Sequence, residues 1–501
     1  MYLTLPILIP LLSGILVMAL WRRRKYQRIV AVIGSAALLV AALALFVQVY
    51  NNSGILVVQI GNWPAPYGIT LVADLMSAML VLVTGVMALV ISIYALYTMD
   101  RSRERFGFLS LYQFLLMGVC GSFLTGDIFN LYVWFEVMLM ASFVLLALGG
   151  ERHQLEGALK YVTLNLIASA FFLAGVGILY GAFGTLNMAD LAVKMQSIED
   201  PRLLTTLSMV FLIAFGIKAA IFPLFFWLPA SYHTPPIATT AIFAALLSKV
   251  GVYALIRVFT LLFIQEVPFT HSLILVLAGF TMLTGVLGAA SHYEIRRILS
   301  FHIVSQIGYM IMGLGLYTRV ALAGALYYIV HNMLAKTNLF LISGLIYRLR
   351  GTYQLKKLGG LYVAAPGLAF LFLIAGMSLA GLPPSSGFFG KLTLVWAGLE
   401  TRHYVIVAVA LVTSILTLYS MTKIWAEAFW KSSPDEALLI AQNAPLQRHE
   451  TWTLYGPIVA LTICILGMAL GAGPILGTVF RAADQLLEPS SYIEAVLGVQ
   501  P

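Results

Sequence analysis

The sequence predicts an all-α polytopic membrane protein of about fourteen transmembrane helices, and composition is the first reason. Of its 501 residues 61% are hydrophobic and only 10% are charged, whereas a soluble domain carries about 25% charged residues. Apolar runs of about 20 residues recur along the chain, each long enough to cross a hydrocarbon core of about 30 Å as a helix. The runs are continuous and show none of the alternation of a membrane barrel, so helices are expected.

The apolar runs place the expected spans along nearly the whole chain. They cover residues 3–21, 28–50, 69–98, 108–125, 128–148, 159–183, 203–228, 236–262, 271–290, 297–316, 319–347, 364–399, 404–430 and 452–478. The first run has no basic stretch before it and no small-residue cleavage pattern, so we interpret it as a span and not as a signal peptide. The connection 51–68 contains "VVQIGNW" followed by two prolines, which predicts a short extended hairpin. No soluble domain is expected, and only about 20 residues, a short tail, follow the last span.

The basic residues give the orientation. The net charge of +9 could suggest nucleic acid, but Lys and Arg cluster in short loops between spans and form no stripe on a soluble domain. Loops on one side hold Arg22, Arg23, Arg24, Lys25, Arg28, Arg101, Arg103, Arg105, Arg152, Lys160, Arg296, Arg297, Arg348, Arg350, Lys356, Lys357, Lys431 and Arg448. The opposite loops hold only Lys194, Arg202, Arg319 and Arg402. Because cytoplasmic loops are enriched in Lys and Arg, both termini are expected on the outer side of a bacterial inner membrane.

Two spans are interrupted by proline and glycine. In "FGIKAAIFPLFFWLPA", Pro223 follows one turn after a lysine; in "AGLPPSSGFFGKL", Pro383, Pro384 and Gly387 precede another. Such breaks free backbone groups that are tolerated only against protein or a watery cavity, so each points to an ion path. They fall in spans seven and twelve, which predicts two inverted five-helix repeats, spans 4–8 and 9–13. The expected units are residues 1–98, 108–262, 271–430 and 452–501.

Ionisable residues inside the spans are the candidate site, because a charge at the bilayer centre costs about 3 kcal/mol on insertion scales. The central ones are Glu136, Lys218, Lys249, His331, Lys336 and Lys391. Asp74, Arg257, Lys423 and Glu427 lie nearer span ends, where Arg257 and Lys423 are expected to extend to the headgroups.

Glu136 is expected to pair with Lys218, because each charge lowers the other's cost of burial. Such a pair could be a structural lock, but the further lysines have no matching carboxylates. Taking an ammonium group out of water favours its neutral form, so a row of buried lysines can form a proton relay. The expected order is Lys218, Lys249, His331 or Lys336, and Lys391, assisted by the hydroxyls of Ser248, Ser305, Thr337, Ser385 and Ser386. Sodium prefers oxygen ligands, and central carboxylates are few, so a proton path is predicted better than a sodium path.

Other motif classes give no site. Cys120 and Cys464 are far apart within apolar runs, so no metal site, iron–sulfur cluster or other cofactor is expected. No phosphate-binding loop, dinucleotide fingerprint or nucleophile elbow occurs in a suitable context. His233 and His302 are either relay members or hydrogen-bonded packing residues; His302 lies one turn from Ser305 and Gln306 on a polar stripe.

Three motifs carry a family resemblance. With the glutamate of span five, "SFHIVSQIGYM" at 300–310, "HNMLAK" at 331–336 and "GLPPSSGFFGKL" at 381–392 resemble the antiporter-like subunits of respiratory complex I and of Mrp-type cation/proton antiporters. The resemblance implies fourteen helices in inverted repeats, a Glu136–Lys218 pair, a bridging Lys249, a central His331 and Lys336, and a terminal Lys391. Within the family the chain is most similar to D-type Mrp subunits, which implies partner membrane subunits of types A, B, C, E, F and G.

Two functions of different class follow from this resemblance. In the preferred one, inward proton movement through the chain drives Na⁺ export by a multisubunit antiporter that contributes to pH homeostasis. In the alternative, the chain is a proton-pumping subunit of complex I or of a membrane-bound hydrogenase, driven by redox chemistry in partner subunits. A third possibility, a scaffold without an ion path, would require the central lysines to be dispensable.

Overall fold

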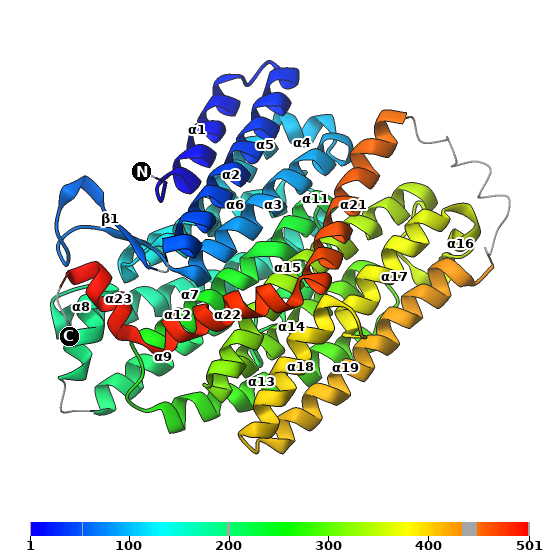
Figure 1. The fold of residues 1–501 in the computed structure, drawn as a ribbon. Coiled ribbons are helices and arrows are strands. Elements are labelled where there is room, and N and C mark those ends of the chain that lie inside the picture. The colour runs from blue at the N-terminus through cyan, green and yellow to red at the C-terminus, as the bar shows by residue number, and fades with distance from the viewer. Residues whose placement is uncertain (1, 53, 198–200, 433–447, 499–501) are drawn as a thin grey trace.

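The structure is a computed structural model, which describes residues 2–52, 54–197, 201–432 and 448–498. Eleven helices in this part of the chain are long and apolar enough to cross a membrane, and three shorter apolar helices, Leu5–Ala19, Phe108–Leu124 and Pro366–Ala380, accompany them. Each expected span overlaps one of these fourteen helices, which lie side by side in a tilted bundle (Figure 1). The predicted fold class is therefore confirmed.

The elements of the first half begin with α1 (Leu5–Ala19) and α2 (Arg24–Asn52), followed by a small hairpin. The hairpin and the next helices are β1 (Leu56–Gln59), η1 (Ile60–Asn62), β2 (Thr70–Ala73), α3 (Leu75–Thr98), α4 (Arg101–Arg105), α5 (Phe108–Leu124) and α6 (Ile128–Ala147). They are followed by α7 (Arg152–Phe183), α8 (Met188–Gln196), α9 (Pro201–Ala219), α10 (Trp227–Ser231), α11 (Ile237–Ile242), the π-helical turn η2 (Phe243–Leu247) and α12 (Ser248–Leu261).

The second half starts with three long helices, α13 (Val267–Ser291), α14 (Ile295–Leu316) and α15 (Arg319–Arg350). The remaining elements are η3 (Leu355–Lys357), α16 (Leu361–Ala364), α17 (Pro366–Ala380), α18 (Ser386–Glu400), α19 (Tyr404–Trp425), the π-helical turn η4 (Ala426–Trp430), α21 (Arg448–Leu470), α22 (Ala472–Leu487) and α23 (Pro489–Leu497).

The expected hairpin forms, but with different strands. Leu56–Gln59 pairs antiparallel with Thr70–Ala73, so the second strand lies where the third span was expected to begin. The third helix starts only at Leu75 because the Asp74 carboxylate caps it, accepting a 2.8 Å hydrogen bond from the Ser77 amide. An acidic N-cap satisfies one orphan donor of the first turn and opposes the positive end of the helix dipole. Asp127 caps α6 in the same way, with 2.7 Å to the Asn130 amide.

Both expected helix breaks are present. Residues 220–226, which include Pro223, are non-helical between α9 and α10, and residues 381–385, which include Pro383 and Pro384, separate α17 from α18. Gly387 is an exception to the prediction, because it lies in the first turn of α18 and not in the break. Its role is steric: a Cβ at this position would overlap the Ser378 carbonyl oxygen and approach His331.

The end of the chain also differs from the expectation. The last span stops at Leu470, eight residues before the predicted position 478, and the short tail folds into α22 and α23. Helix α22 crosses the bundle against α15, α3 and α12, and α23 packs on α8 (Figure 1). The Gln485 side chain accepts a 3.0 Å hydrogen bond from the Leu75 amide, and Arg319 Nη2 lies 2.8 Å from the Asp484 carboxylate. The tail therefore packs along the bundle as part of the fold.

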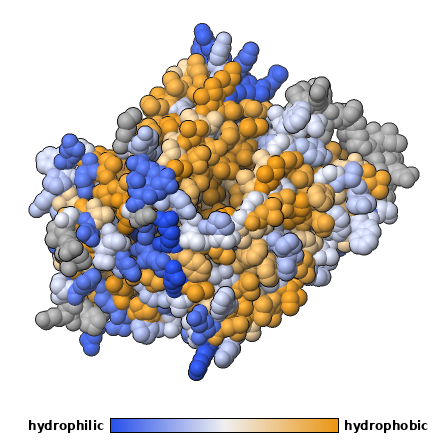
Figure 2. All heavy atoms as spheres, viewed as in Figure 1, coloured by the Kyte–Doolittle hydropathy of each residue, from blue (hydrophilic) through white to orange (hydrophobic). Residues whose placement is uncertain are grey.

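The two ends of the bundle differ in charge. One end, which we call the basic end, carries the loops with most of the Lys and Arg residues, and several of these loops are joined to one another, as in Arg103–Glu151 and Arg296–Pro235. The other end, which we call the hairpin end, carries β1–β2, α8, α23 and the N- and C-terminal parts of the chain (Figure 1). Between the ends Figure 2 shows a predominantly hydrophobic face, as expected of a surface in contact with lipid.

Close helix packing depends on small residues. Gly285 of α13 faces α14 so closely that a Cβ would overlap the backbone nitrogen of Ser305. Small residues let transmembrane helices approach to backbone contact, where van der Waals packing takes the place of a hydrophobic driving force. The α13–α14 contact matters for the site because α14 carries His302 and Ser305.

We expect Gly285→Ala to destabilise the protein by about 1–3 kcal/mol, the usual effect of overpacking a close contact. The measurement is thermal unfolding of the detergent-purified protein, followed by fluorescence-detected size exclusion. Gly181→Ala on α7 is the matched control, since nothing lies within 4 Å of a Cβ at that position. Equal unfolding temperatures for the two variants would contradict this account of the contact.

Candidate functional site

The ionisable residues expected inside the spans lie within the bundle. Lys249, His331 and Lys336 are 0% exposed, Lys218 is 4% exposed and Lys391 is 6% exposed. Glu136 is only half-buried, on a face of α6 that also carries the exposed Val133 and Met140. A fully buried ammonium group is stable only with close acceptors, so the contacts of each lysine define the site.

Glu136 and Lys218 are joined through a third residue. Lys218 Nζ donates a 3.1 Å hydrogen bond to the Ser169 hydroxyl, and this hydroxyl donates to the Glu136 carboxylate. No direct ion pair within 4.0 Å joins the two charges among the ion pairs of the described residues, although they interact electrostatically. The expected pair is therefore a three-membered chain from α6 through α7 to α9. Ser169 was missed because a serine in an apolar span usually bonds its own helix.

Lys218 lies at the end of a half-helix. It occupies the last turn of α9, where the negative end of the helix dipole favours a cation. The Phe135 ring also lies 4.9 Å from its ammonium group. Two other side chains that were not expected from the sequence bond backbone groups near the break. Trp227 Nε1 donates to the Ile217 carbonyl at 2.9 Å, and the Thr281 hydroxyl accepts from the Phe222 amide at 3.0 Å. These bonds give partners to the Ile217 carbonyl and the Phe222 amide, although Pro223 and Phe226 of the break are exposed at the surface.

Lys249 is held by the π-helical turn that precedes it. Its Nζ donates a 2.6 Å hydrogen bond to the carbonyl of Ala244, which lies inside η2. A π-turn shifts the helical hydrogen-bond pattern and so leaves a carbonyl available to a side chain. Two residues further on, Gly251 touches the end of α9, where a Cβ would crowd the Lys218 backbone. The first and second lysines of the row are therefore carried by segments in direct contact.

His331 and Lys336 continue the row on α15. Lys336 Nζ is 3.4 Å from the Leu299 carbonyl of α14 and interacts electrostatically with both Lys249 and Lys391. His331 Nδ1 is 2.9 Å from the Ser386 hydroxyl, which in turn is 3.1 Å from the Ser378 hydroxyl. The imidazole therefore faces the second helix break, with α17 and α18 on either side.

Lys391 closes the row. Its Nζ donates a 2.9 Å hydrogen bond to the carbonyl of Ala380, the last residue of α17, and a 3.2 Å bond to the Ser414 hydroxyl of α19. Like Lys218, its ammonium group thus meets the C-terminal end of a half-helix at a break. The Tyr309 ring lies 4.8 Å away. Ser414 and Tyr309 were not expected from the sequence.

Several buried polar atoms near the row have no hydrogen-bond partner among the residues that the structure describes. They include both ring nitrogens of His302, Nε2 of His331, the side-chain amide of Asn332, and the hydroxyls of Ser248, Ser305 and Ser385. Thr337, by contrast, donates to Met333 of its own helix at 2.7 Å. Buried polar atoms that lack a protein partner require ordered water. The polar surface of the row is thus suited to a water-filled chain of hydrogen bonds.

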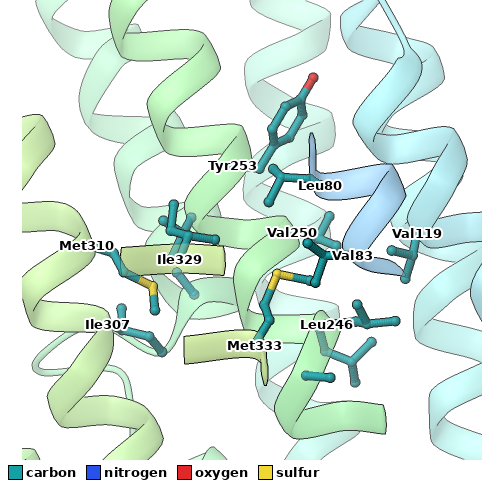
Figure 3. Close-up of a cluster of buried hydrophobic side chains, with 14 of the residues drawn as sticks. Leu80, Val83, Val119, Leu246, Val250, Tyr253, Ile307, Met310, Ile329 and Met333 are labelled. Carbon is teal, nitrogen blue, oxygen red and sulfur yellow. The ribbon is translucent and has the colours of Figure 1, made fainter. Parts of the chain in front are cut away.

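A hydrophobic cluster lies beside the row. Leu80 and Val83 of α3, Val250 of α12, and Met310 and Ile329 of α14 and α15 converge in it (Figure 3). Towards the hairpin end the cluster is followed by the Tyr253 hydroxyl, which Figure 3 shows pointing away from it. Hydrophobic constrictions block ions and water until they are wetted. Along α12, Val250 and Tyr253 lie between Lys249 and the polar residues beyond Tyr253.

Those polar residues form a buried ion pair. Arg257 Nη2 donates to the Asp74 carboxylate and lies 3.3 Å from Ser77 Oγ, and its guanidinium group stacks near Tyr492 of α23. The expectation that Arg257 extends to the headgroups is wrong: the residue is 4% exposed, because the Asp74 cap offers a carboxylate inside the protein. The pair anchors the C-terminal helix to α3 and α12.

The remaining candidates lie at the basic end. Lys423 Nζ bonds the carbonyls of Ala290 and His292 at 2.7 and 2.8 Å, and Glu427 pairs with Lys431 at 3.1 Å. His233 Nδ1 is 2.8 Å from the Pro229 carbonyl, as a packing histidine would be. Among the described residues, no group of three or more His, Cys, Asp or Glu side chains is arranged to hold a metal ion.

Comparison with known proteins decides the family. Residues 125–417 match the family described as NADH:quinone oxidoreductase/Mrp antiporter, TM. The chain belongs to this family. It is 48% identical over 493 residues to the D-type Na⁺/H⁺ antiporter subunit of Alkalihalophilus pseudofirmus, with 98% of each chain covered.

Two solved structures resemble the chain over nearly its whole length. A chain of the Mrp complex from Dietzia sp. DQ12-45-1b has a TM-score of 0.90 at 32% identity, with 99% of both chains covered. A chain of the membrane-bound sulfane sulfur reductase, an archaeal respiratory membrane complex, has a TM-score of 0.89 at 25% identity and the same coverage. The fold is thus shared by antiporter and respiratory complexes.

The Glu136–Ser169–Lys218 chain gives a direct test. We expect Ser169→Ala to lower proton-coupled transport by the assembled complex about 10- to 100-fold, because it removes a hydrogen bond to charged groups. Transport is measured as a pH change in vesicles at matched protein levels. Ser208→Ala is the control, since the Ser208 hydroxyl bonds the Thr205 carbonyl of its own helix, and Ser169→Thr should keep part of the transport that Ser169→Ala loses. A Ser169→Ala variant with full transport would exclude a bridging role for the hydroxyl.

Proposed function

We propose that the chain is the D-type subunit of a multisubunit Na⁺/H⁺ antiporter and provides the proton path that is coupled to Na⁺ export. The observation that carries this proposal is the 48% identity, over nearly the full length, to a protein named as such a subunit. The alternative, a subunit of a redox-driven proton pump, has the weaker support of 25% identity to a chain of a respiratory complex. In the proposed role the chain is a transporter subunit and catalyses no chemical conversion.

The proposed path runs along the buried lysines. Protons pass from Glu136 and Lys218 to Lys249, then to Lys336 and His331, and finally to Lys391. Supporting this order, Lys249 and Lys391 both interact electrostatically with Lys336, and His331 interacts with Lys391 and Lys336. Unpartnered polar atoms of His302, Ser305 and Ser248 line the same region and can bind the water that carries protons between these groups.

The chemistry of the row favours protons over sodium. Desolvation favours the neutral form of an ammonium or imidazole group, so such a group can release and take up a proton, whereas a positive charge repels Na⁺, which needs several oxygen ligands. Glu136 is the one carboxylate of the proposed path, and it is half-buried at the side of the bundle. We therefore assign protons to this row and place the Na⁺ route outside it.

The proposed setting is a bacterial inner membrane with partner subunits. Subunits of types A, B, C, E, F and G are proposed to complete the complex, and the half-exposed face around Glu136 is available to one of them. The two repeats are proposed to span residues 108–262 and 271–430. Their matching helix breaks and the π-helical turns in spans eight and thirteen support this division.

Transport by the assembled complex tests the proposal. We expect Glu136→Gln and Lys391→Ala each to abolish Na⁺-dependent collapse of a proton gradient in inside-out vesicles, because each removes an exchangeable site of the path. Glu156→Gln and Lys357→Ala are the matched controls, since both residues are exposed, and they should keep activity. If the buried-site variants assemble normally and retain antiport, the proton path is not in this row.

Orientation can be tested separately by cysteine labelling of intact cells. We expect Tyr67→Cys, at a position 87% exposed in the hairpin connection, to react with a membrane-impermeant maleimide from outside. Arg101→Cys, at an exposed position of the basic end, should react only after the membrane is opened. The unsubstituted chain gives the background from Cys120 and Cys464, and the reverse labelling pattern would invert the proposed topology.

A further inference from the structure

A groove at the basic end combines positive charge with an apolar floor. It has a volume of about 530 Å³ and lies between the first turns of α2 and the last turns of α3. Its upper part is lined by Arg24, Lys25 and Arg28. Its lower part is formed by aliphatic side chains only, those of Ile29, Val32, Ile33 and Leu96. The groove thus offers two different environments to one elongated ligand.

The part of the groove lined by Arg24, Lys25 and Arg28 keeps a net positive charge. The buried Glu104 carboxylate pairs with Arg24 and with Arg28, whose Nη2 lies 2.7 Å away. Lys25 is exposed, and no ion pair to it occurs in the described part of the chain. Three cations against one carboxylate leave two positive charges, and Glu104 holds two of the cations in place. The groove is thereby prepared for an anion before any ligand arrives.

The position of the groove matches the edge of the membrane. Trp21 and Tyr26, which flank the basic turn, are 50% and 53% exposed, as are aromatic residues at the membrane–water interface. Below them, Ile29 and Ile33 are 44% and 61% exposed on the face that meets lipid. Figure 2 shows hydrophilic atoms capping a hydrophobic surface at the turn between α1 and α2, the top of the view. The charged part of the groove therefore lies at headgroup level.

We propose that this groove is a binding site for an anionic phospholipid. The phosphodiester lies between Lys25 and the free guanidinium nitrogens of Arg24 and Arg28, and one acyl chain follows Ile29, Val32 and Ile33 to Leu96. Basic pockets of this kind on the cytoplasmic side of transmembrane helices suit anionic headgroups. A free phosphate would use the cations but not the aliphatic floor, whereas a zwitterionic lipid would use the floor but bring no net charge.

Native mass spectrometry of the intact complex, released from nanodiscs of dioleoyl phosphatidylglycerol and dioleoyl phosphatidylcholine, tests this site. The native complex should retain phosphatidylglycerol above its share in the disc. Lys25→Gln should lower that retention about fivefold, the effect of one basic side chain near a charged headgroup. Arg23→Gln is the matched control, because Arg23 lies in the same turn but does not line the groove, and it should leave retention unchanged.

A second pair of variants tests the acyl part and guards against misfolding. Ile33→Trp fills the groove while keeping every charge, and Val40→Trp adds the same bulk two turns away at a position 67% exposed. Only Ile33→Trp should lose phosphatidylglycerol, and the unfolding temperatures of the two should agree. The proposal is overturned by equal losses in either matched pair, by no enrichment in the native complex, or by full displacement with inorganic phosphate, which would identify a simple anion site.

Discussion

The structure depends on the need to satisfy backbone carbonyls and buried ammonium groups together inside a membrane. A carbonyl freed by a broken helix costs several kcal/mol in hydrocarbon, and a buried lysine costs more unless it has acceptors. In this protein two lysines use such carbonyls as acceptors: Lys249 bonds a carbonyl in a π-helical turn, and Lys391 bonds the last carbonyl of α17. At these two places the irregularity of the helix stabilises a charge, and the charge stabilises the irregularity.

This coupling explains why the sequence predicted so much of the site. Lysines and prolines are conspicuous in apolar spans, so Lys218, Lys391 and the two breaks could be found from composition and spacing alone. The spans could also be predicted, because a continuous apolar run of about 20 residues is long enough to cross a membrane as a helix. The fourteen helices and their order therefore needed no knowledge of tertiary contacts.

What the sequence did not predict are features decided by packing between distant segments. Ser169 stands between Glu136 and Lys218 because α7 lies between α6 and α9, which spacing along one helix cannot show. Arg257 turned inward because Asp74, 183 residues away in sequence, caps α3 at the same level. The π-helical turn before Lys249 has no proline or glycine within its five residues, so no residue type marks it in the sequence.

The C-terminal segment has a mechanical consequence. Helix α22 lies against α15 of the second half and α3 and α12 of the first, and α23 continues to α8, with Tyr492 over Arg257. A motion that rotated one half against the other would have to break the contacts of this C-terminal segment with both halves. Alternating exposure by large domain rotation is therefore opposed by the architecture. Changes of side-chain rotamer or of bound water within the bundle would, by contrast, leave the contacts of this segment intact.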